Sequence, residues 1–252
     1  MKPPILRVDK LVKRFGGLLA TDHASLEVQA DSIHALIGPN GAGKTTLIHQ
    51  ISGAIPSDGG SIRFDGHDIT SLPMHQRAQR GLVRSYQITS IFGKLSVLDN
   101  LVLAVQARSG SSMRFWAQAS AERARYDESA HWAERIGLGG RLHTIGGLLS
   151  HGEQRQLELG MAMATRPRLL LLDEPMAGMG ADESSRMIEL LLALRHQVTL
   201  VLVEHDMDAV FRLADTISVL VAGKVIASGD AETIRNHPDV KRAYLGDEAH
   251  DA

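Results

Sequence analysis

The chain contains no cysteine, which excludes disulfide bonds and thiolate metal sites. It has no apolar run near the roughly 18 residues that a membrane-spanning helix needs, and its opening, MKPPILRVDK, lacks the apolar centre of a signal peptide. Neither sign of charge dominates, because 27 basic residues face 29 acidic ones and the net charge is -2. Without a basic tract, bulk electrostatics do not favour nucleic acid as a partner. If the protein acts at a membrane, other subunits must hold it there.

The 252 residues, 44% of them hydrophobic, are enough for one large domain with a substantial core. Apolar or alternating runs predict strands at 5–8, 25–28, 33–37, 61–64, 169–172, 198–203 and 217–221. Helical texture predicts helices within 45–52, 73–165, 181–197 and 207–214. The pattern is that of an α/β core interrupted by a helical section.

Residues 38–45 read GPNGAGKT and match the phosphate-binding pattern G-x-x-x-x-G-K-[ST]. In such a loop, glycines let successive backbone N–H groups point at phosphate oxygens, and the following helix presents its positive end. Lys44 would place a cation at the β- and γ-phosphates, and the Thr45 hydroxyl can ligate Mg²⁺. The alternative is a glycine-rich turn without a ligand. The expected nucleotide-binding residues here are Gly38, Pro39, Asn40, Gly41, Ala42, Gly43, Lys44, Thr45 and Thr46.

Two carboxylates, Asp173 and Glu174, follow the apolar run LLLL at 169–172, the first strand predicted after the helical section. Asp173 is suited to hold Mg²⁺, and Glu174 is suited to orient and deprotonate an attacking water. A second strand, in VTLVLVEHD, leads to His205, at the carboxyl end of a core strand where α/β sheets bind ligands. These residues predict ATP hydrolysis rather than nucleotide binding alone.

Residues 149–153, in the stretch LLSHGEQRQLELGMAMA, read LSHGE and resemble LSGGQ, the signature of ATP-binding-cassette (ABC) ATPases. This resemblance covers nearly the whole chain. It implies a phosphate-loop NTPase fold, in which a RecA-like core carries an antiparallel β subdomain and a helical subdomain. We expect one nucleotide-binding domain over 1–252, with its core at 1–87 and 166–237, its helical subdomain at about 88–165 and a C-terminal tail at 238–252.

The resemblance also implies roles for individual residues. Phe15, in KRFGG, looks like the aromatic residue that stacks on adenine, although plain core packing is an open alternative. Gln87, in SYQ, matches the glutamine that contacts Mg²⁺ and the attacking water. Glu174 and His205 match the catalytic glutamate and the switch histidine. With Lys44, these residues form the expected catalytic set, and ATP and Mg²⁺ are the expected cofactors.

Ser150 and Gly152 begin a predicted helix and would form a small anion site at its positive end. In the family, this site meets the γ-phosphate of ATP held by a partner cassette, so ATP joins two cassettes and hydrolysis releases them. Three positions depart from the family pattern: His151 replaces a glycine, Glu153 replaces glutamine, and Gly180 stands where an aspartate is usual. Communication between the two sites of a dimer can therefore differ from that of other members.

The segments AGMG and EHDMD and the ending IRNHPDVKRAYLGDE resemble the cassettes of branched-chain amino-acid importers. Urea and short-chain amide importers share much of this pattern and stay an alternative. The resemblance implies a peripheral subunit on the cytoplasmic face of the inner (plasma) membrane. Its partners would be a second cassette, identical or homologous, transmembrane permease subunits and, indirectly, a periplasmic binding protein. Ile91 and Phe92 are expected to receive a short permease helix, unless they pack under the helical subdomain.

Two other classes remain as rivals. A non-transport cassette ATPase of DNA repair would carry a long coiled-coil insertion before the signature, and the chain has no sustained heptads there. Translation members usually carry two cassettes in one chain. A scaffold that binds ATP without turnover would not need Glu174 and His205.

Overall fold

The computed structural model describes residues 3–85, 91–108 and 119–245. The chain divides into two compact units. The first comprises Met1–Arg84, Arg168–Pro175 and Leu191–Ala252, and the second comprises Ser85–Pro167 and Met176–Leu190. The expected subdomain boundaries at about 88 and 165 stay a prediction, and Gln87 lies outside the described residues.

A six-stranded sheet forms the centre of the first unit, with strand order β10-β9-β3-β8-β7-β6. Its strands are β3 (Ile33–Ile37), β6 (Leu82–Arg84), β7 (Leu169–Asp173), β8 (Thr199–Val203), β9 (Thr216–Val221) and β10 (Lys224–Gly229). All neighbours pair in parallel except β10, which runs antiparallel to β9 at the edge. Every residue of β3, β7 and β8 is buried, which is why these strands read as continuous apolar runs.

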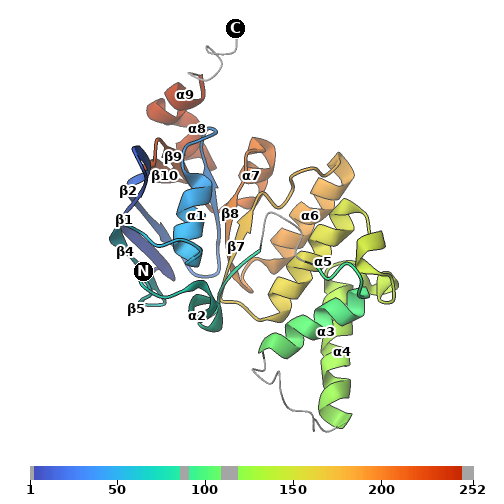
Figure 1. Ribbon diagram of the computed structural model, residues 1–252. Helices are drawn as coiled ribbons and strands as arrows, with labels where there is room; N and C mark the ends of the chain where they lie inside the picture. The colour runs from blue at the N-terminus through green and yellow to red at the C-terminus, as the bar shows by residue number, and fades with distance from the viewer. Residues whose placement is uncertain (1–2, 86–90, 109–118, 246–252) are drawn as a thin grey trace. The chain divides into compact units, whose positions relative to one another are not determined.

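The second sheet of this unit is antiparallel, with order β2-β1-β4-β5. It consists of β1 (Leu6–Phe15), β2 (Leu18–Val28), β4 (Gly59–Phe64) and β5 (His67–Asp68). Helix α1 (Lys44–Ser52) contacts both β2 and β7 and so lies between the two sheets (Figure 1). One apolar cluster, including Leu6, Leu47, Phe64 and Leu171, joins the three layers. The helix that follows the phosphate loop is thereby fixed on both sides.

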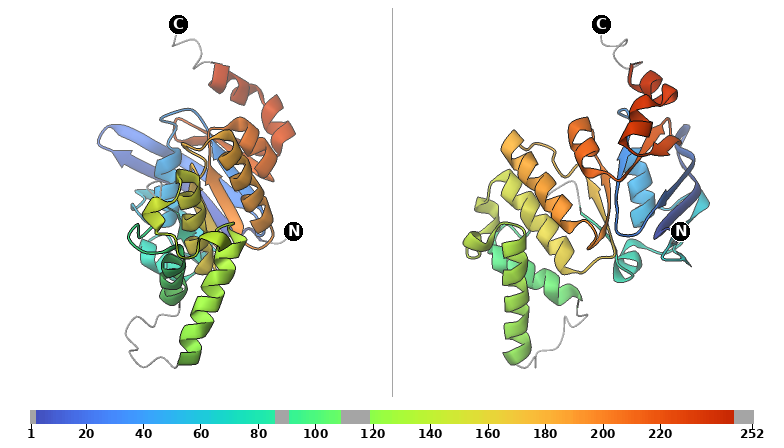
Figure 2. Two further views of the ribbon diagram at one scale, coloured as in Figure 1. Left: turned by 90° about the vertical axis from the view of Figure 1, so that its right-hand side faces the viewer. Right: turned by 180° about the vertical axis from the view of Figure 1, so that it is seen from behind.

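The remaining helices of the first unit are α2 (Met74–Gln79), α7 (Met207–Leu213), α8 (Ala231–Asn236) and α9 (Pro238–Leu245). Helices α8 and α9 pack beside β10 near the end of the chain (Figure 2). From α2, the buried Arg77 donates to the carbonyl oxygens of Gln50 at 2.7 Å and Ile51 at 2.8 Å. These bonds satisfy carbonyls at the C-terminal end of α1, which have no partner within the helix.

The sequence pattern did not predict β10, α8 or α9, and it did not predict the short strand β6. The helical texture of 73–165 contains β6, a strand of three residues that pairs in parallel with β7. Three residues are too few to show the alternation of apolar and polar residues that predicts a strand, so β6 can be recognised only from its pairing with β7.

The second unit is helical and contains α3 (Val97–Arg108), α4 (Ala119–Arg135), α5 (His151–Ala164), the start of α6 (Ala181–Leu194) and two 3₁₀ turns, η1 (Gly139–Arg141) and η2 (Gly146–Leu148). Helices α3, α4 and α5 pack on one another. Glu128 of α4 accepts from Arg108 at 2.7 Å and from Arg166 at 3.0 Å, and these cations lower the pKa of Glu128 to about 2. Within the described ranges, no helix combines the length and apolar character needed to cross a bilayer.

Candidate functional site

Three strands of the large sheet end at one edge. Because β8 pairs in parallel with both β3 and β7, Val203 aligns with Leu36 on one side and with Asp173 on the other. The segments that follow these ends are the phosphate loop, Glu174 and His205. Residues that the sequence predicted separately are thus gathered at the carboxyl edge of the sheet, where open α/β sheets bind ligands.

The phosphate loop leaves backbone donors unused. Helix α1 begins at Lys44 after Gly43, with no side-chain cap and no acidic residue in its first turn. Its first N–H groups therefore have no acceptor in the helix, and the helix dipole favours an anion there. At Gly43, whose φ is +101°, the loop packs too closely for a side chain, because a β-carbon there would lie 2.2 Å from the carbonyl oxygen of Ala20. This geometry suits the binding of phosphate.

Lys44 lies over the loop that precedes it. Its Nζ donates to the carbonyl oxygens of Gly38 at 2.6 Å and Pro39 at 3.0 Å. Burial lowers the pKa of Lys44, while the negative charges of Glu174 and Asp173 act in the opposite direction. The ammonium group therefore lies in the field of the acidic pair, and its two acceptors are ones that phosphate oxygens can replace.

Asp173, at the end of β7, carries a buried carboxylate. Its Oδ2 accepts from Arg84 Nη2 at 3.0 Å, while its Oδ1 has no hydrogen-bond partner among the described residues. An oxygen of this kind suits a hard divalent cation. The described part of the chain contains no cluster of three or more His, Asp or Glu side chains arranged for a metal. Mg²⁺ takes one or two protein oxygens and completes its shell with phosphates and water, so Oδ1 of Asp173 is an oxygen that this ion can use.

Arg84 was missed by the sequence analysis. It ends β6, and the register of β6 with β7 places it opposite Leu171, two residues before Asp173. Its side chain is 6% exposed. The only signal in the sequence is a cation just before the SYQ segment, which does not reveal the pairing of the two strands.

Glu174 follows in an uncommon backbone conformation for a residue with a side chain, with φ of +50°. Its N–H donates to the carbonyl oxygen of Val203 at 2.9 Å, which ties the turn to the end of β8. His205 is exposed, and its N–H donates to Oε2 of the buried Glu204 at 3.2 Å. Glu204 is a second residue that the sequence analysis did not single out. A partly buried carboxylate and an exposed imidazole at neighbouring strand ends can serve as a general base and a phosphate contact.

Phe15 ends β1 and pairs across the hairpin with Leu18. The two side chains are 49% and 66% exposed, so core packing does not account for Phe15. Lys13 Nζ lies 5.6 Å from the centroid of the ring. An exposed aromatic ring beside a cation is a surface on which a planar base can stack.

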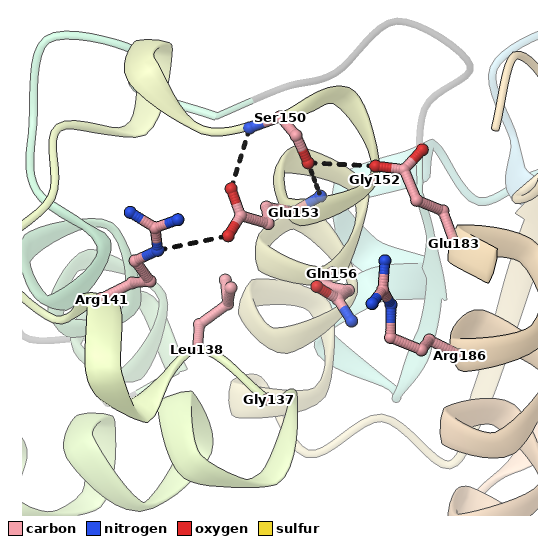
Figure 3. A pocket seen from close by; sticks show the side chains of 9 residues that line it. All are labelled: Gly137, Leu138, Arg141, Ser150, Gly152, Glu153, Gln156, Glu183 and Arg186. Carbon is pink, nitrogen blue, oxygen red and sulfur yellow. Dashed lines mark hydrogen bonds and ion pairs between the residues drawn. The ribbon is translucent and has the colours of Figure 1, made fainter. Parts of the chain in front are cut away.

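The signature segment belongs to the second unit, and Figure 3 shows it from close by. Ser150 caps α5, because its Oγ accepts from the N–H of Glu153 at 3.2 Å while Oε2 of Glu153 accepts from the N–H of Ser150 at 2.9 Å. Ser150 Oγ also donates to Oε1 of Glu183 at 3.1 Å. Arg141 pairs with Glu153 at 3.3 Å. A cavity of about 350 Å³ adjoins these groups, lined by Gly137, Leu138, Arg141, Ser150, Gly152, Glu153, Gln156, Glu183 and Arg186.

His151, one of the departures from the family pattern, lies beside the AGMG segment. A β-carbon on Gly178, in the AGMG segment, would lie 3.5 Å from Cε1 of His151. Gly178 has φ of +76°, and a β-carbon on Gly180 would meet nothing within 4 Å. The imidazole of His151 thus occupies space beside a loop that carries little side-chain bulk.

Comparison with known proteins agrees with these features. The family model described as ABC transporter matches residues 21–177, and the model described as branched-chain amino acid ATP-binding cassette transporter matches residues 224–250. BraF, a high-affinity branched-chain amino acid transport ATP-binding protein of Pseudomonas aeruginosa, is 40% identical, covering 98% of this chain and 100% of BraF. LivG of Escherichia coli, described in the same words, is 41% identical with the same coverage. The lipopolysaccharide export protein LptB of Haemophilus influenzae is 34% identical over 97% of this chain and 98% of LptB.

Among solved structures, the ADP conformation of MJ1267, an ATP-binding cassette of an ABC transporter, superposes with a TM-score of 0.85 at 28% identity. The match covers 97% of this chain and all of that cassette. The expected phosphate-loop cassette fold is therefore confirmed. The chain belongs to the ABC transporter family, and it is one of the family's ATP-binding, ATP-hydrolysing subunits.

Proposed function

We propose that this chain is the ATPase subunit of an importer for branched-chain or other hydrophobic amino acids. The observation that carries the choice is the match of residues 224–250 to the branched-chain amino acid cassette model. It is supported by 40% and 41% identity to BraF and LivG over nearly the whole of each chain, against 34% for the export protein LptB. A urea or amide importer is the alternative that a transport assay must exclude.

Several groups at the carboxyl edge of the large sheet support nucleotide binding. The first N–H groups of α1 and the ammonium of Lys44 would take the phosphates, and Phe15 would stack on adenine. Oδ1 of Asp173 and the hydroxyl of Thr45 would hold Mg²⁺, together with Gln87. The bound ion supplies positive charge to the phosphate oxygens. Pro39, Asn40 and Ala42 of the loop and Thr46 in the first turn of α1 would surround the phosphates.

Hydrolysis requires a base near the terminal phosphate. Glu174 has a partly buried carboxylate, fixed through its backbone bond to Val203, and it would take a proton from the attacking water. Gln87 and His205 would orient that water and contact the γ-phosphate. Lys44 offsets negative charge as the phosphoryl group leaves.

Coupling to transport needs partners. ATP on the phosphate loop would be completed by Ser150 and Gly152 of a second cassette, identical or homologous. Permease subunits would hold the pair at the cytoplasmic face of the membrane and receive substrate from a periplasmic binding protein. This assembly gives ATP the role of a ligand that stabilises one of two states.

An exposed apolar surface in the second unit supports permease docking. Phe92 is 53% exposed, Ile145 is 38% exposed and Leu148 is 78% exposed. The two segments lie side by side, because the N–H of Gly147 donates to the carbonyl oxygen of Gly93 at 2.9 Å. Clustered apolar side chains on a surface favour contact with another protein.

The variant Glu174→Gln tests the chemistry. It keeps the size of the side chain but removes the base, so ATP affinity should persist, turnover should fall at least a hundredfold, and an ATP-bound dimer should accumulate. Steady-state hydrolysis and sedimentation velocity report the two effects. Hydrolysis at the wild-type rate would refute the role of Glu174.

The transport assignment needs the assembled system. The chain should co-purify with membrane-spanning partners, and the complex in proteoliposomes should take up leucine with ATP on the side of the cassettes. Urea and acetamide are the competing substrates, and a complex carrying Lys44→Ala is the inactive control. Uptake of urea or acetamide without leucine would move the proposal to the alternative importer.

A further inference from the structure

We propose that Glu183 gates the signature site. Its carboxylate accepts the hydrogen bond that the Ser150 hydroxyl can donate, and the terminal phosphate of ATP on a second cassette must displace this carboxylate. The inference rests on the proposed function, because it concerns the same composite site. Glu183 lies at the start of α6, outside every motif that the sequence analysis identified.

The hydrogen-bonding capacity of Ser150 is already in use. Its Oγ accepts from the N–H of Glu153 at 3.2 Å and donates to Oε1 of Glu183 at 3.1 Å. A serine hydroxyl has a single proton to donate. Phosphate oxygens at neutral pH are acceptors, so they need the proton that Glu183 holds. The two acceptors therefore compete for one donor.

The carboxylate of Glu183 also covers the backbone of the signature. A β-carbon on Gly152 would lie 2.6 Å from the carboxylate carbon of Glu183, so this carboxylate fills the space that the missing side chain leaves. It lies at the N-terminal end of α5, where the helix dipole stabilises a negative charge. A phosphate that binds at this helix end would take the same position, and the carboxylate would repel it because both groups are negatively charged. Occupation by Glu183 and occupation by phosphate exclude each other.

The cavity offers a second place for the displaced carboxylate. Arg186 lies three residues further along α6 and lines the same cavity as Glu183 (Figure 3). Residues three apart on a helix are neighbours, so a change of rotamer can bring the two charges together. Glu153 has no such freedom, because the N–H of Ser150 and the guanidinium of Arg141 both hold it. Glu183 is thus the movable carboxylate and Glu153 the fixed one.

The test uses the full chain with Glu174→Gln as the parent, and sedimentation velocity at several ATP concentrations gives the dimer dissociation constant. Glu183→Gln removes the charge, and Glu183→Ala removes the acceptor. Each should lower the dissociation constant by about tenfold or more, the size expected for a hydrogen bond to a charged group. Arg186→Met should raise it, because the displaced carboxylate loses its second partner. Asp182→Asn is the matched control, since Asp182 is an exposed acid in the same first turn of α6.

The outcomes separate the gate from the function on which it rests. If the parent shows no ATP-dependent dimer, the proposed nucleotide sandwich of this chain is overturned, and the gate with it. If the parent dimerises but the Glu183 variants match Asp182→Asn, or dimerise more weakly, the gate alone is overturned. Without the Glu174→Gln change, Glu183→Gln should lower the half-saturating ATP concentration, and Asp182→Asn should leave it at the wild-type value. Thermal melting of both Glu183 variants checks that they are folded.

Discussion

The buried pair of Arg84 and Asp173 gives the sharpest prediction for stability. Replacing Arg84 by Met removes the guanidinium that donates to Asp173 at 3.0 Å and leaves a fully buried carboxylate without its hydrogen-bonded cation. Methionine keeps much of the apolar volume of the stem, so the main effect is the uncompensated charge. Breaking a buried ion pair from one side costs about 3–5 kcal/mol.

That cost is large enough to measure by melting. For a chain of this size, 1 kcal/mol shifts the melting temperature by about 2–4 °C, so Arg84→Met should melt roughly 6–20 °C below the wild type. Adding Asp173→Asn removes the stranded charge and should recover most of the loss, even though the double variant cannot hold Mg²⁺ through a carboxylate. The two single variants and the double variant form a double-mutant cycle that isolates the pair.

Differential scanning calorimetry in nucleotide-free buffer is the appropriate assay, because bound nucleotide would stabilise the variants unequally. Arg63→Met is the matched control, since Arg63 is an exposed arginine of β4 in the same unit, and such surface changes stay within about 0.5 kcal/mol. The reasoning is refuted if Arg84→Met melts within 2 °C of Arg63→Met, or if the double variant is no more stable than Arg84→Met.

Three further predictions concern single side chains. Lys44→Ala should abolish ATP binding and with it the stabilisation of about 2.7 kcal/mol expected at a hundred times the dissociation constant; unchanged affinity by calorimetry contradicts this. Burial lowers the pKa of His34 from 6.5 to about 4. Below pH 6.5 the unfolded chain therefore binds a proton at this histidine that the folded chain does not bind. The free energy of unfolding should fall by about 3 kcal/mol between pH 6.5 and 4. His34→Gln should flatten that interval in denaturant titrations, and an unchanged slope would count against the cause. Phe15→Ala should weaken ATP binding by about 1–3 kcal/mol while Phe15→Tyr does not, as titration with a fluorescent ATP analogue can show.

The sequence was most informative where a residue's surroundings are set by its own segment. Strands β3, β7 and β8 are buried along their whole length, so their apolar runs predicted them directly. The polar residues that follow these runs had to meet at one edge once the strands were parallel. The location of the phosphate loop near Asp173 and Glu174 was therefore predictable without a structure.

Contacts between distant segments could not be predicted in this way. Arg84 and Asp173 are 89 residues apart, and Ser150 and Glu183 are 33 apart. Neither Arg84 nor Glu183 belongs to a motif with its own period or spacing. Arg84 acquires its role only when β6 pairs with β7, and Glu183 only when the start of α6 lies beside the signature segment. The sequence therefore predicted Asp173 and Ser150 but not the residues that bind them.

The changes in the signature alter the surroundings of the Ser150 hydroxyl and leave the hydroxyl itself in place. Glu153 completes the capping box as glutamine would, because either side chain can accept from the N–H of the capping residue. The extra negative charge that glutamate brings is paired with Arg141. The anion affinity of the site therefore depends on two carboxylates and two guanidinium groups around one helix end, and only Glu183 among them competes directly for the hydroxyl proton. A phosphate that replaces Glu183 gains the donor without disturbing the cap, so α5 can keep its structure in both states.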